Sequence, residues 1–342
     1  MAVEVDDLFL LRKMLCSPNI LAKLIAKNSC EITFNIDNFL FNKIPVVSSE
    51  PDPREVYCIQ SPSTKKYFLK LNQHAWKIEN EYRAYKLIRF YAVREFSSPE
   101  ILDLQINVPY GETEGQQCSW LIEEWLDYKK EVDNSQDLLL SARILAQINS
   151  MMIDLEQISR LFSTPTPSKD KLAENARLDI ISELRRDLPV LDKNITLQIS
   201  KAAVYFENKR FPYMLSFNHG DYHKRNIIMQ AKKKTSPIVL DWEDFRIDNP
   251  IYDLSHFLYF LQPCDWSSAI RGYFSNLGNI FVQFSSLEIV EMIVSMYSVW
   301  AARNLRWSAR RIDDPAQLQL CQNKIASQYC AIRSLSWKNL VK

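Results

Sequence analysis

Apolar residues recur at helical spacing at the start of the chain and give way to a strand pattern further along. From Asp6 to Lys27 they repeat every three to four residues, with a break at Ser17 and Pro18, which predicts two short amphipathic helices. Between Ile32 and Leu71 the apolar runs become short and are separated by turn-forming residues. The runs KIPVVSS, EVYCIQ and KKYFLKL predict three consecutive antiparallel strands.

The middle of the chain changes from mixed to mostly helical texture. Residues Ala75 to Arg89 place aromatic and aliphatic side chains among charges and contain neither Gly nor Pro, which predicts a helix. Two more strands are expected at Pro99 to Val108 and at Cys118 to Trp125. Strand signals return once more, between Met214 and Leu240. Helices are expected at Gln136 to Glu156, Asp170 to Arg186 and Thr196 to Asn208, and again after Asp253.

These patterns predict an α+β protein with two lobes. Residues 1–125 are expected to form a small N-terminal lobe around an antiparallel sheet, with a helical cover at about residues 1–30. Residues 126–342 are expected to form a larger, mostly helical lobe.

The composition excludes several classes of protein. Among 342 residues, 42 basic and 41 acidic side chains give a net charge of +1, so no overall field favours nucleic acid. Seven cysteines form no C-x-x-C pair and their number is odd, which fits reduced thiols. Acidic residues precede the first apolar run, and the longest uncharged stretch, Tyr273 to Leu287, contains many polar residues. We expect a cytoplasmic protein without a membrane span, either a monomer or a homodimer.

One stretch carries the candidate chemistry. Phe217 to Met229 have the sequence FNHGDYHKRNIIM, and Pro237 to Glu243 have the sequence PIVLDWE. Asp221 and Asn226 are five residues apart, which is the Asp to Asn spacing of the kinase catalytic loop. The apolar runs that follow predict a hairpin, which would bring Asp241 close to Asn226 so that carboxylate and amide oxygens can share hard cations.

At these residues the sequence resembles the aminoglycoside phosphotransferase and choline kinase family. The signature of that family pairs an H-G-D-x-x-x-x-N loop with a strand ending in a triplet like Asp241-Trp242-Glu243. The resemblance implies a bilobed protein-kinase-like fold whose catalytic loop is residues 217–243. It implies that Asp221 is the catalytic base or hydroxyl-orienting carboxylate, and that Asn226 and Asp241 bind Mg²⁺.

The resemblance also implies supporting roles. His219 would hold the backbone of the catalytic loop through ring hydrogen bonds, whereas zinc binding by His219, Asp221 and His223 would need further ligands. His223 would face the substrate or stand in an exposed turn. Asp253 precedes an apolar run and is predicted to be a helix N-cap that positions the catalytic segment.

In the first lobe the resemblance assigns nucleotide contacts by position. Lys70 stands where such kinases keep the lysine that holds the phosphates, and Glu81 is its expected ion-pair partner, in preference to Glu79. The backbone of the hinge would bind the adenine edge. The hinge residues are Glu123, Glu124, Trp125 and Leu126.

The turn expected to cover the nucleotide phosphates contains no glycine. A glycine-rich loop is usual there because it allows close approach of the backbone. In this chain the turn runs from Ser48 to Arg54, and Ser48 and Ser49 are predicted to offer hydrogen bonds to the phosphates instead.

We therefore expect an ATP- or GTP-dependent phosphotransferase with an alcohol group as acceptor and Mg²⁺ as cofactor. The acceptor would be a small metabolite or an antibiotic, aminoglycoside-like or choline-like, and antibiotic resistance is one role that the resemblance suggests. The alternative is a catalytically silent kinase-fold binding or structural protein. Carboxylates that would suit a cationic acceptor are Asp244, Asp248, Asp265, Asp313 and Asp314, whereas Arg246 and the stretch Arg303 to Arg311 argue for the opposite charge.

Overall fold

The chain divides into two compact units. A computed structural model describes residues 7–25, 33–36, 38–44, 54–91, 96–110, 115–126, 135–151, 153–162, 167–188, 193–208, 214–229, 236–281, 283–311 and 315–336. The first unit comprises Met1–Val93 and Ser97–Lys129, and the second comprises Arg94–Phe96 and Lys130–Lys342.

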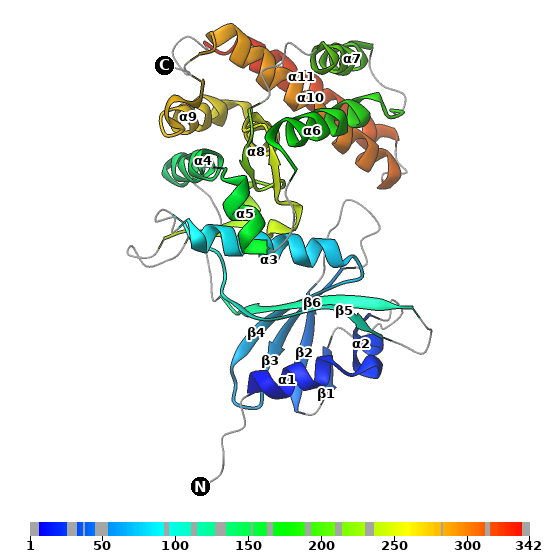
Figure 1. Ribbon diagram of the computed structural model, residues 1–342. Coiled ribbons are helices and arrows are strands. Elements are labelled where there is room, and N and C mark those ends of the chain that lie inside the picture. The colour runs from blue at the N-terminus through cyan, green and yellow to red at the C-terminus, as the bar shows by residue number, and fades with distance from the viewer. Residues whose placement is uncertain are drawn as a thin grey trace. The chain divides into compact units, whose positions relative to one another are not determined.

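Within the described residues, the first unit is a six-stranded antiparallel sheet with helices on both faces (Figure 1). The strand order is β1-β2-β3-β4-β6-β5. The strands are β1 (Thr33–Ile36), β2 (Phe39–Ile44), β3 (Glu55–Gln60), β4 (Lys66–Asn72), β5 (Ile101–Pro109) and β6 (Gln117–Glu124). The helices are α1 (Asp7–Leu15), α2 (Pro18–Ile25) and α3 (Ala75–Phe90). The two predicted N-terminal helices and the helix after β4 are confirmed.

The prediction of three strands between Ile32 and Leu71 was wrong at its start. The described residues contain four strands there, because β1 and β2 form an additional hairpin. Asn38 lies at its turn with φ 69°. The sequence pair Asp37-Asn38 was the signal for this turn, since Asp and Asn tolerate the left-handed backbone of tight hairpins. The predicted run KIPVVSS overlaps β2 only at Lys43 and Ile44.

Alternation along the strands separates an apolar face, which packs against α1 and α2, from a face that carries Lys70. Tyr57 and Ile59 of β3, with alternate residues of β4 and β6, pack against α1 and α2 in one hydrophobic cluster. The Tyr57 hydroxyl donates a hydrogen bond to the carbonyl of Leu24, 2.5 Å away, which fixes α2 to the sheet. Lys70 points to the opposite face, where its ammonium contacts Glu81 of α3.

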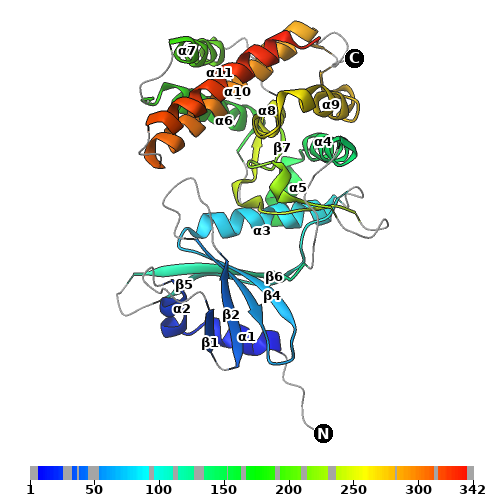
Figure 2. The same ribbon diagram turned by 180° about the vertical axis from the view of Figure 1, so that it is seen from behind.

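The second unit is mostly helical (Figures 1 and 2). Its helices are α4 (Ser135–Ser150), α5 (Leu155–Phe162), α6 (Lys169–Arg185), α7 (Lys193–Glu207), α8 (Ile251–Phe260), α9 (Pro263–Phe274), α10 (Ser286–Arg311) and α11 (Pro315–Ser334). Short strands form two antiparallel pairs, β7 (Ser216–Asn218) with β10 (Arg246–Asp248) and β8 (Ile227–Ile228) with β9 (Ile238–Val239). The predicted helix at Gln136 to Glu156 is broken into α4 and α5.

The core of this unit surrounds α8, whose first nine residues are all buried. Long α10 packs along α8, and the Trp300 indole donates a hydrogen bond to the carbonyl of Tyr252, 3.0 Å away. The aromatic side chains Tyr297 and Trp300 of α10 are therefore part of the core. No single helix within the described ranges is long and apolar enough to cross a membrane, although α4 and α5 together, bent by 90°, pass the same test.

Candidate active site

The loop that follows β7 is held by a carboxylate from α8. One oxygen of Asp253 accepts the backbone N–H of His219 at 2.6 Å, and the other accepts that of Gly220 at 3.0 Å. Burial raises the pKa of Asp253 to about 7, although these two N–H groups act in the opposite direction. Asp253 thus contacts the segment that it was predicted to support.

The prediction that Asp253 is a helix N-cap was wrong. Helix α8 begins at Ile251, directly after Pro250, so Asp253 is its third residue. The carboxamide of Asn249 accepts the N–H of Ile251 at 2.9 Å and performs the capping role. The side chain of Asp253 is therefore available to the loop.

Gly220 is required at its position in the loop. Its φ is +89°, and a Cβ there would lie 1.9 Å from the carbonyl oxygen of Asp244. The loop therefore presses its backbone directly against the turn after β9, which only glycine permits.

The ring of His219 is structural and neutral. Its Nδ1 accepts the backbone N–H of Asp221 at 3.2 Å, so Nε2 carries the proton and donates to the carbonyl of Leu240, 2.7 Å away. Burial lowers the pKa of His219 to about 4. Because both ring nitrogens are occupied by backbone groups, the zinc alternative is not supported.

Asp221 presents a partly exposed carboxylate surrounded by hydrogen-bond donors. Its side chain is 35% exposed. One oxygen, Oδ2, lies 3.5 Å from Nε2 of His223 and 3.3 Å from the amide nitrogen of Asn226, whereas Oδ1 lies 3.5 Å from Nε2 of His256. Burial would raise the pKa of Asp221, but the two histidines outweigh it and the pKa is lowered. Asp221 is therefore an ionised acceptor.

The hairpin brings Asn226 and Asp241 together as the sequence predicts. Ile227 pairs with Val239, and the carbonyl of Asn226 accepts the N–H of Leu240 at 2.8 Å. The amide nitrogen of Asn226 donates to the carbonyl of Asp221 at 2.9 Å, which orients the amide. Asp241 follows with φ 62° and ψ 57°, a left-handed conformation that is unusual for a residue other than glycine.

Two oxygen ligands suit Mg²⁺ better than a transition metal. Mg²⁺ is commonly bound by one or two side-chain oxygens, with water and substrate phosphates completing its shell. Over the described part of the chain, no group of three or more His, Cys, Asp or Glu side chains is placed to hold a metal. Asn226 and Asp241 therefore offer the type of oxygen ligand that Mg²⁺ prefers.

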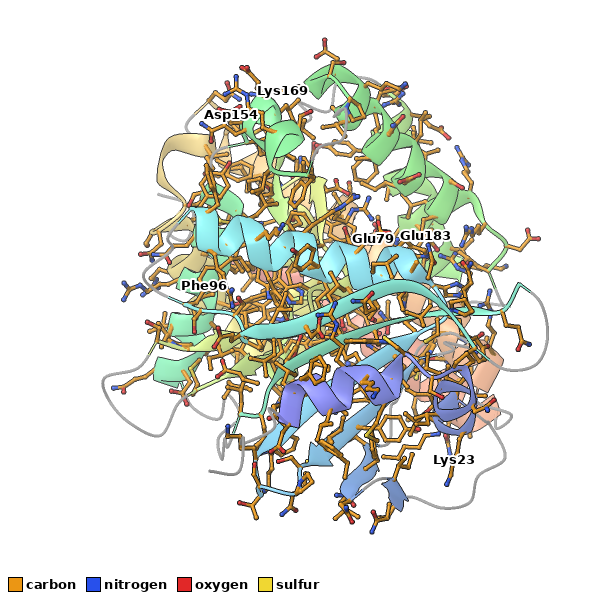
Figure 3. All side chains as sticks on the ribbon, turned by 60° about the horizontal axis from the view of Figure 1, so that its bottom comes forward. Lys23, Glu79, Phe96, Asp154, Lys169 and Glu183 are labelled. Carbon is orange, nitrogen blue, oxygen red and sulfur yellow. The ribbon has the colours of Figure 1, made fainter. Side chains whose placement is uncertain are left out.

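In the first unit, Lys70 and Glu81 form a buried ion pair with 2.6 Å between Nζ and Oε1. The side chain of the competing residue, Glu79, labelled in Figure 3, is 40% exposed and pairs with Arg83 at 3.5 Å. The Tyr85 hydroxyl lies 2.9 Å from carboxylate oxygens of both Glu81 and Glu123. Burial, with both carboxylates nearby, raises the pKa of Tyr85 well above its usual value.

The other residues predicted to contact the nucleotide are in the hinge and in the turn from Ser48 to Arg54. The N–H and side chain of Glu124 bond to Glu100. Trp125 packs against the ring of Phe68 at 6.5 Å, and the described residues extend to Leu126. The binding of adenine by this segment stays a prediction. Ser48 and Ser49 lie outside the described residues.

Several residues that support the site were missed in the sequence. The side-chain amide of Asn149 on α4 donates to the carbonyl of Phe217 at 2.7 Å, and Tyr273 donates to Asn149 at 2.8 Å. Tyr222 donates to the carbonyl of Ser141 at 2.6 Å. These contacts anchor the catalytic loop to α4. Asn149 is 68 positions from Phe217, and Ser141 is 81 positions from Tyr222, so spacing along the sequence could not identify these contacts.

Comparisons with known proteins define the class. Solved structures with a similar fold include a macrolide 2'-phosphotransferase type I, with TM-score 0.56, 13% identity and coverage of 89% of this chain and 95% of that chain. A microcompartment-associated aminopropanol kinase is similar with TM-score 0.54 and 13% identity, and the match covers 90% of this chain and 96% of that chain. A Plasmodium vivax ethanolamine kinase is similar with TM-score 0.52 and 14% identity, and the match covers 96% of this chain and 89% of that chain. The predicted kinase-like α+β fold is confirmed.

The family is also defined by sequence. Residues 43–282 match the model of the phosphotransferase enzyme family. The chain belongs to this family, which includes the aminoglycoside phosphotransferases and choline kinases. Among curated proteins, none matches the chain in sequence.

Proposed function

We propose that the protein transfers the γ-phosphoryl group of ATP or GTP to a hydroxyl group of a small molecule. The observation that carries this proposal is the placement of Asp221 and Asn226 in one loop, with the Asn226 amide oriented by Asp221 and followed across the hairpin by Asp241. Phosphoryl transfer needs a carboxylate at the attacking hydroxyl and oxygen ligands for Mg²⁺, and these residues supply both.

Each residue has a defined task in this proposal. The ionised carboxylate of Asp221 accepts a hydrogen bond from the acceptor hydroxyl and orients its oxygen. It takes the proton as the new oxygen–phosphorus bond forms and the bond from the γ-phosphorus to the departing ADP or GDP breaks. Lys70, held by Glu81, contacts the nucleotide phosphates. Mg²⁺ on Asn226 and Asp241 would offset the negative charge of those phosphates.

Two arginines near the His256 ring disfavour an acceptor with a quaternary ammonium group. Arg246 and Arg303 lie over the ring of Tyr252, with 4.6 and 5.8 Å between guanidinium carbon and ring centroid. Arg303 also covers Trp300 at 5.0 Å. Aromatic faces recognise quaternary ammonium ions through cation–π contacts, and here arginines already occupy them.

The carboxylates considered for a cationic acceptor do not form one cluster. Asp248 is fully buried and pairs with Arg246 at 2.6 Å, Asp244 is exposed, and Asp265 lies in the first turn of α9. Asp313 and Asp314 lie outside the described residues. A neutral or anionic acceptor is therefore the form of the proposal that these side chains support.

Calorimetric titration of MgATP and MgGTP into the wild type and Asp241→Asn tests the proposal. We expect Mg²⁺-dependent binding to the wild type and a loss of at least tenfold in affinity in the variant, because a charged ligand of the cation is removed. Asp179→Asn is the matched control, since this exposed carboxylate on α6 undergoes the same loss of charge. If neither nucleotide binds the wild type, the proposal is overturned in favour of the catalytically silent alternative.

A binding result is followed by an acceptor screen. Candidate hydroxyl compounds, including sugars, hydroxy acids, macrolides, aminoglycosides and choline, are scored by formation of ADP or GDP over the rate without acceptor. Asp221→Ala should lower turnover by about 10²–10⁴ while nucleotide binding is kept, because it removes the group that accepts the proton. Equal turnover in this variant would remove Asp221 from its role.

A further inference from the structure

A third histidine contacts the site from α8. His256 is 2% exposed, and its ring is stacked on that of Trp300 with 3.7 Å between centroids and 23° between planes. The ring of Phe260 contacts it edge-on at 4.9 Å. These contacts leave His256 little freedom to rotate, so its Nε2 is held at one position.

That position is beside Oδ1 of Asp221, the carboxylate oxygen that His223 and Asn226 do not approach. Nε2 of His256 lies 3.5 Å from Oδ1, while His223 and Asn226 approach Oδ2. The distance is long for a hydrogen bond, as is common for catalytic contacts before the reaction partners bind. The two histidines thus approach the carboxylate at different oxygens, and their rings are 5.9 Å apart.

The hydrogen-bonding partners of His256 favour one tautomer. Its Nδ1 is buried and has no hydrogen-bond partner among the described residues. A buried N–H without an acceptor is costly, so the proton of a neutral ring is better placed on Nε2, next to the carboxylate. Burial also lowers the pKa of His256 to about 3, which keeps the ring neutral.

We propose that His256 is a positioning residue for phosphoryl transfer: its neutral ring, fixed by Trp300, donates from Nε2 to Oδ1 of Asp221 and sets the rotation of that carboxylate. This inference rests on the proposed function, since it assigns a task to a neighbour of the proposed base. With Oδ2 held by His223 and Asn226, the donor at Oδ1 leaves the carboxylate a single orientation toward the acceptor hydroxyl.

NMR of the ¹⁵N-histidine-labelled protein tests the contact without nucleotide or acceptor. The chain has four histidines, so His256→Phe and His74→Phe assign their signals directly. We expect His256 to be neutral with the proton on Nε2, and we expect Asp221→Ala to change its ring nitrogen shifts. The control Asp179→Ala, which removes an exposed carboxylate from α6, should leave the ring nitrogen shifts of His256 unchanged. Three results would each overturn the proposal: a proton on Nδ1 of His256, a charged His256 ring, or ring nitrogen shifts that are the same in Asp221→Ala as in the wild type.

Kinetics then separate positioning from folding. His256→Phe keeps the ring that stacks on Trp300 but loses the donor, whereas His256→Gln keeps a donor near the position of Nε2. With an acceptor that the wild type phosphorylates, we expect His256→Phe to lower kcat by about tenfold to a hundredfold with little change in the KM for MgATP. His256→Gln should recover part of that loss, and His74→Phe, at an exposed site, should behave as wild type.

The two proposals fail in different ways. If MgATP does not bind the wild type, the proposed function fails, while the tautomer of His256 still decides whether Asp221 receives its hydrogen bond. If MgATP binds, the acceptor is phosphorylated and His256→Phe has the wild-type kcat, then the positioning role is overturned and the proposed function stands.

Discussion

The carboxylate of Asp253 accepts the backbone N–H of Gly220 at 3.0 Å across 33 positions of sequence, and thereby joins helix α8 to the catalytic loop. The second oxygen takes the neighbouring N–H of His219. The conformation of the loop therefore depends on a side chain from a helix that is itself almost fully buried.

Asp253→Ala should destabilise the fold by about 2–5 kcal/mol, because it leaves two buried N–H groups without acceptors. Asp253→Asn keeps one acceptor oxygen and should lose less. Urea denaturation measures both, with Asp265→Ala at the start of α9 as the control. A loss below 1 kcal/mol in Asp253→Ala would show that the loop does not depend on this carboxylate.

Two glycines with positive φ allow steric crowding to be separated from backbone strain. Gly220→Ala forces a Cβ into the carbonyl of Asp244, whereas at Gly278, with φ +69°, a Cβ would meet no atom within 4 Å. Gly278→Ala should therefore cost about 1–2 kcal/mol, from backbone conformation alone. Gly220→Ala should cost considerably more, in unfolding free energy or in loss of soluble protein. Equal costs would contradict the close approach at Gly220.

Variants of the Lys70 and Glu81 pair should separate its contribution to folding stability from its contribution to nucleotide affinity. Lys70→Met leaves Glu81 as an uncompensated buried charge and should cost about 3–5 kcal/mol. The double variant with Glu81→Met should regain much of that stability but not the affinity for MgATP. Lys43→Met, which breaks the more exposed 2.6 Å pair with Glu55, should cost about 1 kcal/mol or less and keep nucleotide affinity. Denaturation and calorimetry distinguish these outcomes.

Buried neutral histidines should make the fold sensitive to acid. The pKa of His256 is lowered to about 3 and that of His219 to about 4, whereas in the unfolded chain both titrate near 6.5. Their stabilising contribution is therefore present above about pH 6.5 and is lost as pH falls toward 4, because only the unfolded chain binds these protons. The raised pKa of Asp253 acts with the opposite sign over the same range, since there the folded chain binds the extra proton.

His256→Phe removes one of the two buried histidines and should therefore make the free energy of unfolding fall less steeply as pH is lowered. Between about pH 6 and 4, the free energy of unfolding should change by about 1.4 kcal/mol per pH unit less in the variant than in the wild type. The charged or titratable groups that act on His256 are Asp221, His223, Arg303 and His219, and all four side chains are retained in the variant. Parallel pH profiles of the two proteins would show that His256 is already protonated in the folded state.

The sequence predicted those parts of the site that are close together along the chain. Asp221, Asn226 and Asp241 lie in a loop and hairpin whose spacing and apolar runs are local properties. His256 and Asn149 reach the loop only through the packing of α8 and α4, so their contacts depend on tertiary structure. Asp253 was recognised but placed in the wrong role, because Asn249 competes for the helix cap.

The same limit applies in the first unit. Lys70 and Glu81 were predicted from the resemblance, and their ion pair is present. Tyr85 was not predicted, because the two carboxylates it joins lie on α3 and β6 and only the folded sheet brings them together. The hairpin of β1 and β2 was missed for a different reason: its turn carries Asn instead of glycine.

The left-handed backbone of Asp241 has a consequence for how this chain can evolve. A non-glycine residue in that conformation costs about 1 kcal/mol, which glycine would avoid. Selection on this backbone conformation alone would therefore favour replacement of Asp241 by glycine, whereas the proposed binding of Mg²⁺ by its carboxylate would oppose that replacement. A descendant that no longer performed catalysis would be expected to lose Asp241 early and to become more stable as it did so.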